Sequence, residues 1–132
     1  MLNKNQVLDR LSEFCWHMQL DRSQIQVLGG SAMVLRDLRF ETADIDLYVP
    51  TEDCRRMIMT GVYYKQPVKD KPNVMWVVGG VIDARDTKHE CDRTICGYPV
   101  QSIKSLLDLK LPLNRKKDEQ DIKILKEALL RE

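Results

Sequence analysis

Residues 29–47 read GGSAMVLRDLRFETADIDL, and this stretch decides how the chain folds. A Gly-Gly-Ser turn follows the apolar end of QIQVL (24–28), and the residues behind the turn have the composition of a short helix. Asp44 and Asp46 then stand one residue apart in a strand-like run, DIDLYV. Because side chains alternate along a strand, both carboxylates point to the same face. Carboxylates this close repel each other unless a cation or a proton lies between them, and their oxygens are ligands that Mg²⁺ prefers.

The turn before the helix suits the phosphates of a nucleotide. Gly29 and Gly30 allow the backbone to approach a ligand closely, and the N–H groups at a helix start attract anions. Ser31 adds a hydroxyl at the same point. The same residues also fit an ordinary strand-to-helix turn in which Ser31 is only the N-cap. The two interpretations are compatible, because a helix start with free N–H groups is itself a phosphate site.

A third carboxylate, Asp83, lies within the apolar run VVGGVIDAR. An aspartate in such a strand is costly unless it has a partner. It is either bonded to the backbone or faces the same metal ions as Asp44 and Asp46. Three carboxylates around two divalent ions are the arrangement for in-line nucleotidyl transfer, with Asp83 as the general base or as a ligand of the nucleophile's metal. Asp-x-Asp alone is a weak signal, and it gains strength from following Gly-Gly-Ser at this spacing.

The segment LLDLKLPLNRKKDEQDI, residues 106–122, supplies positive charge. Its candidate cations are Lys110, Arg115, Lys116 and Lys117. Lysine and arginine bind phosphate oxygens, so Lys110 and one of the other three can face a triphosphate, held in place by Asp118 and Asp121. Alternatively, the segment is a helix end, a solvated basic loop and the start of another helix. Charge alone favours neither interpretation.

Composition places the chain in the class of soluble globular proteins. Its 132 residues are 43% apolar and 31% charged, which fits a single domain over residues 1–132. No run of 18 apolar residues predicts a membrane span, and charged residues interrupt the apolar positions near the N-terminus, which argues against a signal peptide. A net charge of +1 argues against a protein that coats nucleic acid.

Four cysteines are scattered without a Cys-x-x-Cys pair, so reduced thiols and a cytoplasmic location are expected. His89, Cys91 and Cys96 resemble half of a zinc site, but the matching half is missing, and they are interpreted as ordinary loop and strand residues.

Periodicity and turn residues predict an α/β (α+β) fold, a small mixed sheet flanked by helices. The expected helices cover residues 5–18, 31–38, 51–60, 103–110 and 117–130. The expected strands cover residues 24–28, 45–49, 74–78 and 81–84, with a short edge strand within 94–100. Gly79-Gly80 is the predicted turn of a hairpin, and residues 65–73 are predicted to be a loop.

Together these motifs resemble the minimal nucleotidyltransferase signature of the polymerase-β-like superfamily. That signature is a Gly-Ser turn, then Asp-x-Asp, then a third carboxylate on a later strand. The family's C-terminal pattern, a lysine followed by Arg-x-Lys-Asp-x-x-Asp-Ile, is similar to Lys110 with residues 115–122. The resemblance spans residues 25–125 and is strongest to small bacterial and phage members, including antibiotic nucleotidyltransferases and nucleotidyltransferase antitoxins. A resemblance to the head domain of tRNA nucleotidyltransferases is weaker, because Arg36-Asp37 lies later than that pattern requires.

The resemblance implies a polymerase-β-like fold and transfer of AMP from ATP, or of another nucleotide, to a hydroxyl with release of pyrophosphate. It implies that Asp44, Asp46 and Asp83 form the catalytic site and bind Mg²⁺ or Mn²⁺. It further implies nucleotide binding by Gly29, Gly30, Ser31, Lys110, Arg115 and Lys117. The acceptor is a protein such as a toxin, an RNA or a small molecule. Antibiotic-modifying relatives usually hold the acceptor with an extra helical domain or a dimer partner, so a homodimer or a macromolecular acceptor is expected here.

A second hypothesis is a nucleotide-binding or partner-binding module, antitoxin or regulatory, that keeps the fold without essential catalysis. Exposed apolar residues such as Trp76, Met57 or Met59 would mark its docking surface, although methionines more often fill a core. Three retained carboxylates favour catalysis over this hypothesis. A nucleic-acid-binding protein without chemistry is disfavoured by the near-neutral charge and by an aromatic content of only 6%.

Overall fold

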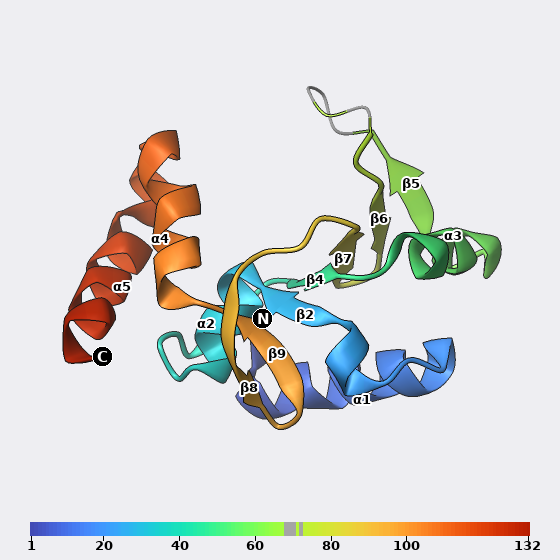
Figure 1. The fold of residues 1–132 in the computed structure, drawn as a ribbon, viewed down its shortest axis with the longest axis horizontal. Helices are drawn as coiled ribbons and strands as arrows, with labels where there is room; N and C mark the ends of the chain where they lie inside the picture. Colours follow the sequence, from blue (N-terminus) through green and yellow to red (C-terminus); the bar gives the residue numbers. More distant parts are fainter. Residues whose placement is uncertain (68–70, 72) are drawn as a thin grey trace.

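A seven-stranded mixed sheet forms the centre of the protein in a computed structural model that describes residues 1–67, 71 and 73–132 (Figure 1). Its strand order is β5-β6-β7-β4-β2-β9-β8. The strands are β2 (Gln26–Leu28), β4 (Ile45–Tyr48), β5 (Tyr64–Gln66), β6 (Trp76–Gly79), β7 (Ile82–Arg85), β8 (Cys91–Ile95) and β9 (Tyr98–Gln101). A separate pair of short strands joins β1 (Leu2–Asn3) to β3 (Glu41–Thr42). The predicted fold class, a mixed sheet with flanking helices, is confirmed.

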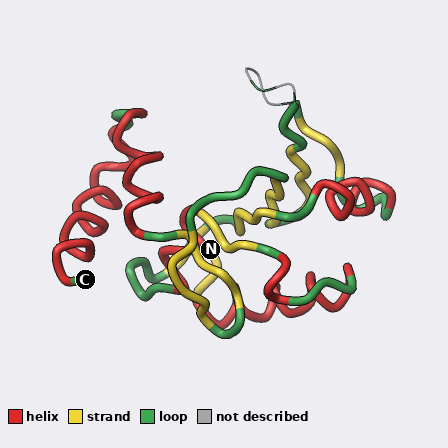
Figure 2. The backbone as a smooth tube through the Cα atoms, in the orientation of Figure 1, coloured by secondary structure: helices red, strands yellow, loops and turns green. Residues whose placement is uncertain are grey.

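Five α-helices surround the sheet in the described part of the chain (Figure 2). They are α1 (Lys4–Met18), α2 (Gly29–Leu35), α3 (Thr51–Met59), α4 (Ile103–Lys110) and α5 (Glu119–Arg131). Short 3₁₀ turns cover Arg22–Gln24, Leu111–Leu113 and Lys116–Asp118. Asn3 begins α1 with a capping box, in which its side chain accepts from the Gln6 N–H while the Gln6 side chain accepts from the Asn3 N–H. All five helices are therefore where the sequence periodicity predicts them, with ends that differ by a few residues.

The core lies on one face of the sheet. Along β4, Ile45 and Leu47 are fully buried, whereas Asp46 and Tyr48 between them are half-buried on the opposite face. The helix α1 turns a buried stripe toward this core (Val7, Leu11, Phe14, Cys15 and Met18). In Figure 1, α1 lies below β2 and β4, and α4 packs side by side with α5 at one end of the molecule. The other face of β4 and β7 is left open for side chains of the candidate site.

The first correction concerns the start of α2. The predicted helix over residues 31–38 begins at Gly29 and ends at Leu35, and Ser31 is not its N-cap. Leu28 is the residue before the first turn and has no capping side chain. Ser31 is buried inside the helix, and its hydroxyl donates to the Leu28 carbonyl at 2.7 Å. Gly29 and Gly30 are thus the first residues of α2. Gly29 joins it to β2 with a positive φ of +58°, which ordinary side chains rarely accept.

The second correction concerns residues 94–100, which form a hairpin instead of a single edge strand. Cys96 and Gly97 both have positive φ and make its two-residue turn. The returning strand β9 lies inside the sheet, where Val100 pairs with Val27 in parallel, and β8 is the edge. The cysteine at a position of positive φ hid this turn, because turns of this kind are usually recognised from Asn-Gly or Asp-Gly.

The β6–β7 hairpin is confirmed, with its strands one or two residues later than predicted. Its turn is Gly80-Val81 and not the predicted Gly79-Gly80, because Gly79 is the last residue of β6 and pairs with Ile82. Of the predicted loop 65–73, Lys65 and Gln66 belong to β5, and residues 68–70 and 72 lie outside the described residues. Within the described residues, no helix has both the length and the apolar character needed to cross a membrane.

Candidate active site

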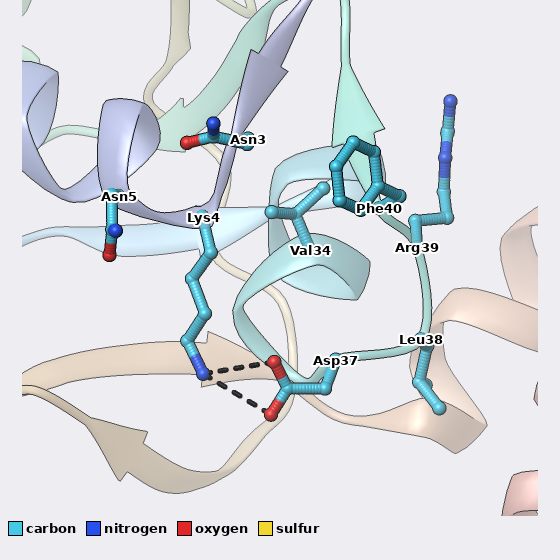
Figure 3. Close-up of a pocket in the computed structure, with 8 residues that line it drawn as sticks. All are labelled: Asn3, Lys4, Asn5, Val34, Asp37, Leu38, Arg39 and Phe40. Atoms are coloured by element: carbon cyan, nitrogen blue, oxygen red, sulfur yellow. Dashed lines mark hydrogen bonds and ion pairs between the residues drawn. The ribbon is translucent and has the colours of Figure 1, made fainter.

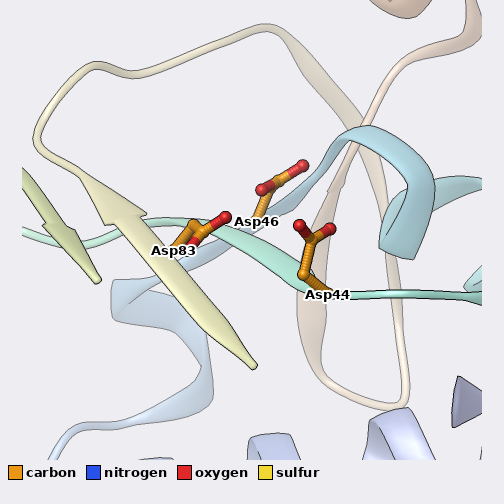
Figure 4. Close-up of side chains that lie close together, drawn as sticks. All are labelled: Asp44, Asp46 and Asp83. Atoms are coloured by element: carbon orange, nitrogen blue, oxygen red, sulfur yellow. The ribbon is translucent and has the colours of Figure 1, made fainter. Parts of the chain in front are cut away.

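The three predicted carboxylates converge on the open face of β4 and β7 (Figure 4). These strands run parallel, with Asp46 directly beside Asp83, and Asp44 precedes β4 on the same face. One oxygen from each carboxylate lies within 4.8 Å of one oxygen from each of the others. The register between two strands therefore brings together side chains that are nearly forty positions apart in the sequence.

Crowding and burial make this cluster unfavourable in its fully charged form. Burial, followed by the charges of Asp44 and Asp83, raises the pKa of Asp46 from 3.8 to about 7, and nearby Arg85 and Lys110 only partly oppose this. Burial also raises the pKa of Asp83, with a further contribution from the charge of Asp44 and from a hydrogen bond with it. Such a set needs protons or cations between its members. Three carboxylate groups with no histidine or cysteine among them fit Mg²⁺ or Mn²⁺, which prefer oxygen ligands.

Gly29 lies directly against the cluster. A Cβ atom at this position would be 2.5 Å from Oδ2 of Asp46, and the φ of +58° would strain any other residue. The Gly29 N–H donates to Oε1 of Gln101 at 2.9 Å. Ser31 reaches the same strand, because its hydroxyl accepts from the Asp46 N–H at 3.3 Å while it donates to Leu28. The Gly-Gly-Ser turn therefore fixes the position of Asp46 relative to α2.

Gly30 faces two residues that the sequence did not single out. A Cβ atom there would lie 2.9 Å from both Nη1 of Arg39 and Oγ1 of Thr42. Arg39 is held by Asp121 of α5 at 3.5 Å. A cation thus stands beside the start of α2, supplied by the segment between α2 and β3.

Two of the three predicted phosphate-binding cations line the same cleft as two of the carboxylates. Lys110 and Arg115 line one cleft together with Asp46 and Asp83. Nζ of Lys110 lies 3.2 Å from Asp118 and 3.4 Å from Asp121, and Arg115 donates to Asp118. Although burial opposes it, the hydrogen bonds from Arg115 and Lys110 lower the pKa of Asp118 and keep it charged. The predicted holding role of these two aspartates is therefore confirmed.

Lys117 does not line this cleft and is fully solvent-exposed in its 3₁₀ turn. Periodicity could not separate it from Arg115, because the basic loop between α4 and α5 has no regular repeat.

The cleft has a volume of about 350 Å³, within the range of small-molecule sites. The α4 side contributes Leu106, Leu109 and Lys110, and the strand side contributes Trp76, Arg85 and His89. Sequence reasoning missed these strand-side residues as site members. Arg85 could have been found, since it stands two positions after Asp83 and must share its face. Gln101 could not, because it reaches Gly29 only through the pairing of β9 with β2.

Other hollows in the described residues lack this chemistry. The hollow in Figure 3 lies between the start of α1 and the segment after α2. Two of its charged residues, Lys4 and Asp37, form an ion pair with each other, in which Nζ of Lys4 lies 3.1 Å and 3.2 Å from the two carboxylate oxygens. A larger hollow beside α1 is lined by Trp16, His17 and Tyr63. Neither contains a carboxylate cluster, so the cleft above β4 and β7 is the candidate active site.

No family model matches the sequence, and no curated protein matches it. Among solved structures, the chain is similar to ANT(2″)-Ia, an aminoglycoside nucleotidyltransferase, in complex with adenylyl-2″-tobramycin. The TM-score is 0.59 at 16% sequence identity, over 95% of this chain and 90% of that chain. The chain therefore has the fold of a nucleotidyltransferase structure, as its sequence motifs implied.

Proposed function

We propose that this protein is a metal-dependent nucleotidyltransferase that transfers AMP from ATP to a hydroxyl and releases pyrophosphate. The observation that carries the proposal is the triad of Asp44, Asp46 and Asp83, with oxygens within 4.8 Å of one another. Asp46 and Asp83 line a cleft together with Lys110. A structural carboxylate is normally paired with a cation of the protein. These three are paired mainly with each other, which suits a site that is completed by bound ions.

Each side chain has a distinct role in this proposal. When bound, Mg²⁺ or Mn²⁺ supplies Lewis-acid stabilisation of the triphosphate and lowers the pKa of the acceptor hydroxyl. Asp44 and Asp46 hold the ions, and Asp83 accepts the proton of the attacking hydroxyl. The new bond joins the acceptor oxygen to the α-phosphorus, and the bond that breaks leaves pyrophosphate.

The α4–α5 side of the cleft binds the departing phosphates. Lys110 and Arg115 line the cleft, and their ion pairs with Asp118 and Asp121 restrict both side chains, so little side-chain entropy would be lost when a triphosphate binds. Phosphate contacts at the start of α2 would fall to the N–H groups of Gly30 and Ser31, because the Gly29 N–H already donates to Gln101. Lys117 would contribute only long-range attraction from outside the cleft.

The test is a transfer assay with each nucleoside triphosphate labelled at the α-phosphate, in Mg²⁺ or Mn²⁺, with a host lysate and with purified acceptors that include tobramycin. We expect label to appear on an acceptor with the wild-type protein and with Asp37→Asn, an exposed acidic residue away from the cleft. Asp44→Asn should abolish it. Labelling that persists undiminished in Asp44→Asn would exclude this site as the catalyst.

The alternative is a partner-binding module, such as an antitoxin, and one observation favours it. Trp16 is 83% exposed and Met59 is 84% exposed, which is unusual for such large apolar side chains. Of the three predicted markers, Met59 is therefore exposed, whereas Met57 is fully buried and Trp76 is half-buried in the cleft. Under this alternative, Trp16→Ser and Met59→Ser would abolish function in the host while Asp44→Asn would not.

Light scattering of the purified chain would test the proposed homodimer.

A further inference from the structure

The two walls of the cleft differ in how their cations are neutralised. On the α4–α5 wall, Lys110 and Arg115 form ion pairs with aspartates. On the opposite wall, Arg85 extends from β7 and has no carboxylate within ion-pair distance among the described residues. The strand order separates the walls, since β7 and β6 lie on one side of β4 while β9, which leads into α4, lies on the other.

Arg85 is held by stacking instead of by charge. It pairs directly with Trp76 across β6 and β7, and its guanidinium carbon lies 4.5 Å from the centre of the indole ring. The neighbouring carboxylate of Asp86 is engaged elsewhere, because it accepts from the Thr51 hydroxyl and from the Met75 N–H, each at 3.0 Å. A guanidinium that stacks on an aromatic ring keeps its N–H edge available for a planar anion or a phosphate.

The strand β7 fixes the position of Arg85 relative to Asp83 of the candidate active site. Asp83 and Arg85 are two residues apart on one strand, so both side chains rise from the same face about one strand repeat apart. His89 also lines this wall, and burial together with the charges of Arg85 and Lys71 lowers its pKa, so its ring is neutral at about pH 7. Among the residues that the structure describes, Asp46 and Asp83 are the acidic ones that line the cleft. An acceptor on this wall meets a cation and a neutral ring.

We propose that Arg85, stacked on Trp76, binds a phosphate group of the acceptor, so that the hydroxyl substrate is a phosphorylated molecule such as a nucleoside 5′-phosphate. This inference rests on the proposed transferase function. The phosphate sits on the strand wall, one strand repeat from Asp83, while the triphosphate of the donor occupies the α4–α5 wall. A polycationic aminoglycoside would meet the charge of Arg85, which makes it a poor acceptor here.

Tryptophan fluorescence can test this subsite without any transfer. The chain has two tryptophans, and Trp16 is far more exposed than Trp76, so Trp16→Phe leaves Trp76 as the only reporter, in the cleft itself. In this background, with Mg²⁺ present, the probes are uridine 5′-monophosphate and uridine, which differ only by the phosphate. We expect the monophosphate to change the fluorescence of Trp76 and uridine to bind on the order of tenfold to a hundredfold more weakly.

Two substitutions separate the walls. Arg85→Gln should weaken monophosphate binding on the order of tenfold to a hundredfold and leave ATP binding intact, and Lys110→Gln should do the reverse. Arg85→Lys keeps the positive charge but lacks the planar set of guanidinium N–H donors, so it should recover part of the affinity for the monophosphate. Such recovery would show that the loss in Arg85→Gln is not a folding defect. Equal binding of uridine and its monophosphate would overturn the inference. So would monophosphate binding that depends on Lys110 and not on Arg85.

Transfer assays then distinguish this inference from the proposed function. Label appearing on uridine 5′-monophosphate, or on the end of a 5′-phosphorylated oligoribonucleotide, supports both and identifies whether a free or a polymeric phosphate is used. Binding that depends on Arg85 without any transfer supports the subsite and counts against the transferase. Transfer to tobramycin in preference to every phosphorylated acceptor would overturn the subsite and leave the transferase standing.

Discussion

Asp46→Asn is expected to stabilise the metal-free protein, and the gain should grow as the pH rises. The native pKa of Asp46 is raised from 3.8 to about 7, so the unfolded chain releases this proton more readily than the native chain does. A native pKa above the unfolded value contributes stability that is complete below about pH 4 and is lost as the pH rises through about 7. Asparagine cannot ionise and avoids that loss. A shift of this size corresponds to roughly 4 kcal/mol, which is the upper limit of the gain because Asp44 and Asp83 also readjust.

The assay is chemical unfolding in the presence of a chelator, at a series of pH values from about 4 to about 9. Asp9→Asn, an exposed residue of α1, is the matched control and should follow the wild type at every pH. The reasoning is refuted if the difference in unfolding free energy between Asp46→Asn and wild type does not change with pH. It is also refuted if the variant loses stability steadily as the pH rises.

Added Mg²⁺ should reverse this order, because the ion binds the native carboxylates and not the unfolded chain. At a concentration of about 100 times its dissociation constant it would stabilise the wild type by about 2.7 kcal/mol, and Asp46→Asn much less. Calorimetric titration of both proteins checks the difference. An equal Mg²⁺ effect on the melting temperature of the two proteins would remove Asp46 from the metal site.

Two further substitutions test the surroundings of the triad. Gly29→Ala should lose transfer activity and about 1–3 kcal/mol of stability, because the new Cβ would collide with Asp46 and the φ at this position is positive. The control is Gly80→Ala, which has nearly the same φ but open space around it and should lose stability alone. Thermal unfolding measures the stability of both variants, and the transfer assay measures their activity. Lys110→Gln should weaken ATP binding on the order of tenfold or more in a titration while Lys117→Gln changes it little, and equal effects of the two would contradict the placement of Lys110 in the cleft.

Local sequence signals predict the strands and helices well here because most of them have clear periods and clear ends. Asp44 and Asp46 could be assigned to one face of a strand from their spacing alone. Placing Asp83 beside them required the assumption that two strands pair, and the parallel register of β4 and β7 supplies that pairing. A resemblance to known motifs could suggest the pairing, but no property of either strand alone determines its neighbour.

Most of what sequence reasoning missed depends on contacts between distant segments. Gln101 accepts from the Gly29 N–H only because β9 runs beside β2. Ser31 looked like a helix cap, yet its hydroxyl connects α2 to the strand of Asp46. The turn at Cys96 and Gly97 is a local feature, and it was missed because a cysteine occupies a position of positive φ, so β9 was taken for an edge.

The likeness to an aminoglycoside nucleotidyltransferase structure extends over nearly the whole chain, and yet it says little about the acceptor. The shared fold accounts for the strands that bring the three carboxylates together, because their geometry follows from strand register. The acceptor wall depends instead on individual side chains at the open ends of β6 and β7, where a substitution leaves the fold intact. At that place this chain has Arg85 on Trp76, a cation in the cleft that the proposed acceptor would enter. Like charges repel in a partly buried cleft more than in water, so this residue alone disfavours a polycation. The acceptor is therefore better deduced from the charge of this wall than from the identity of a structural neighbour.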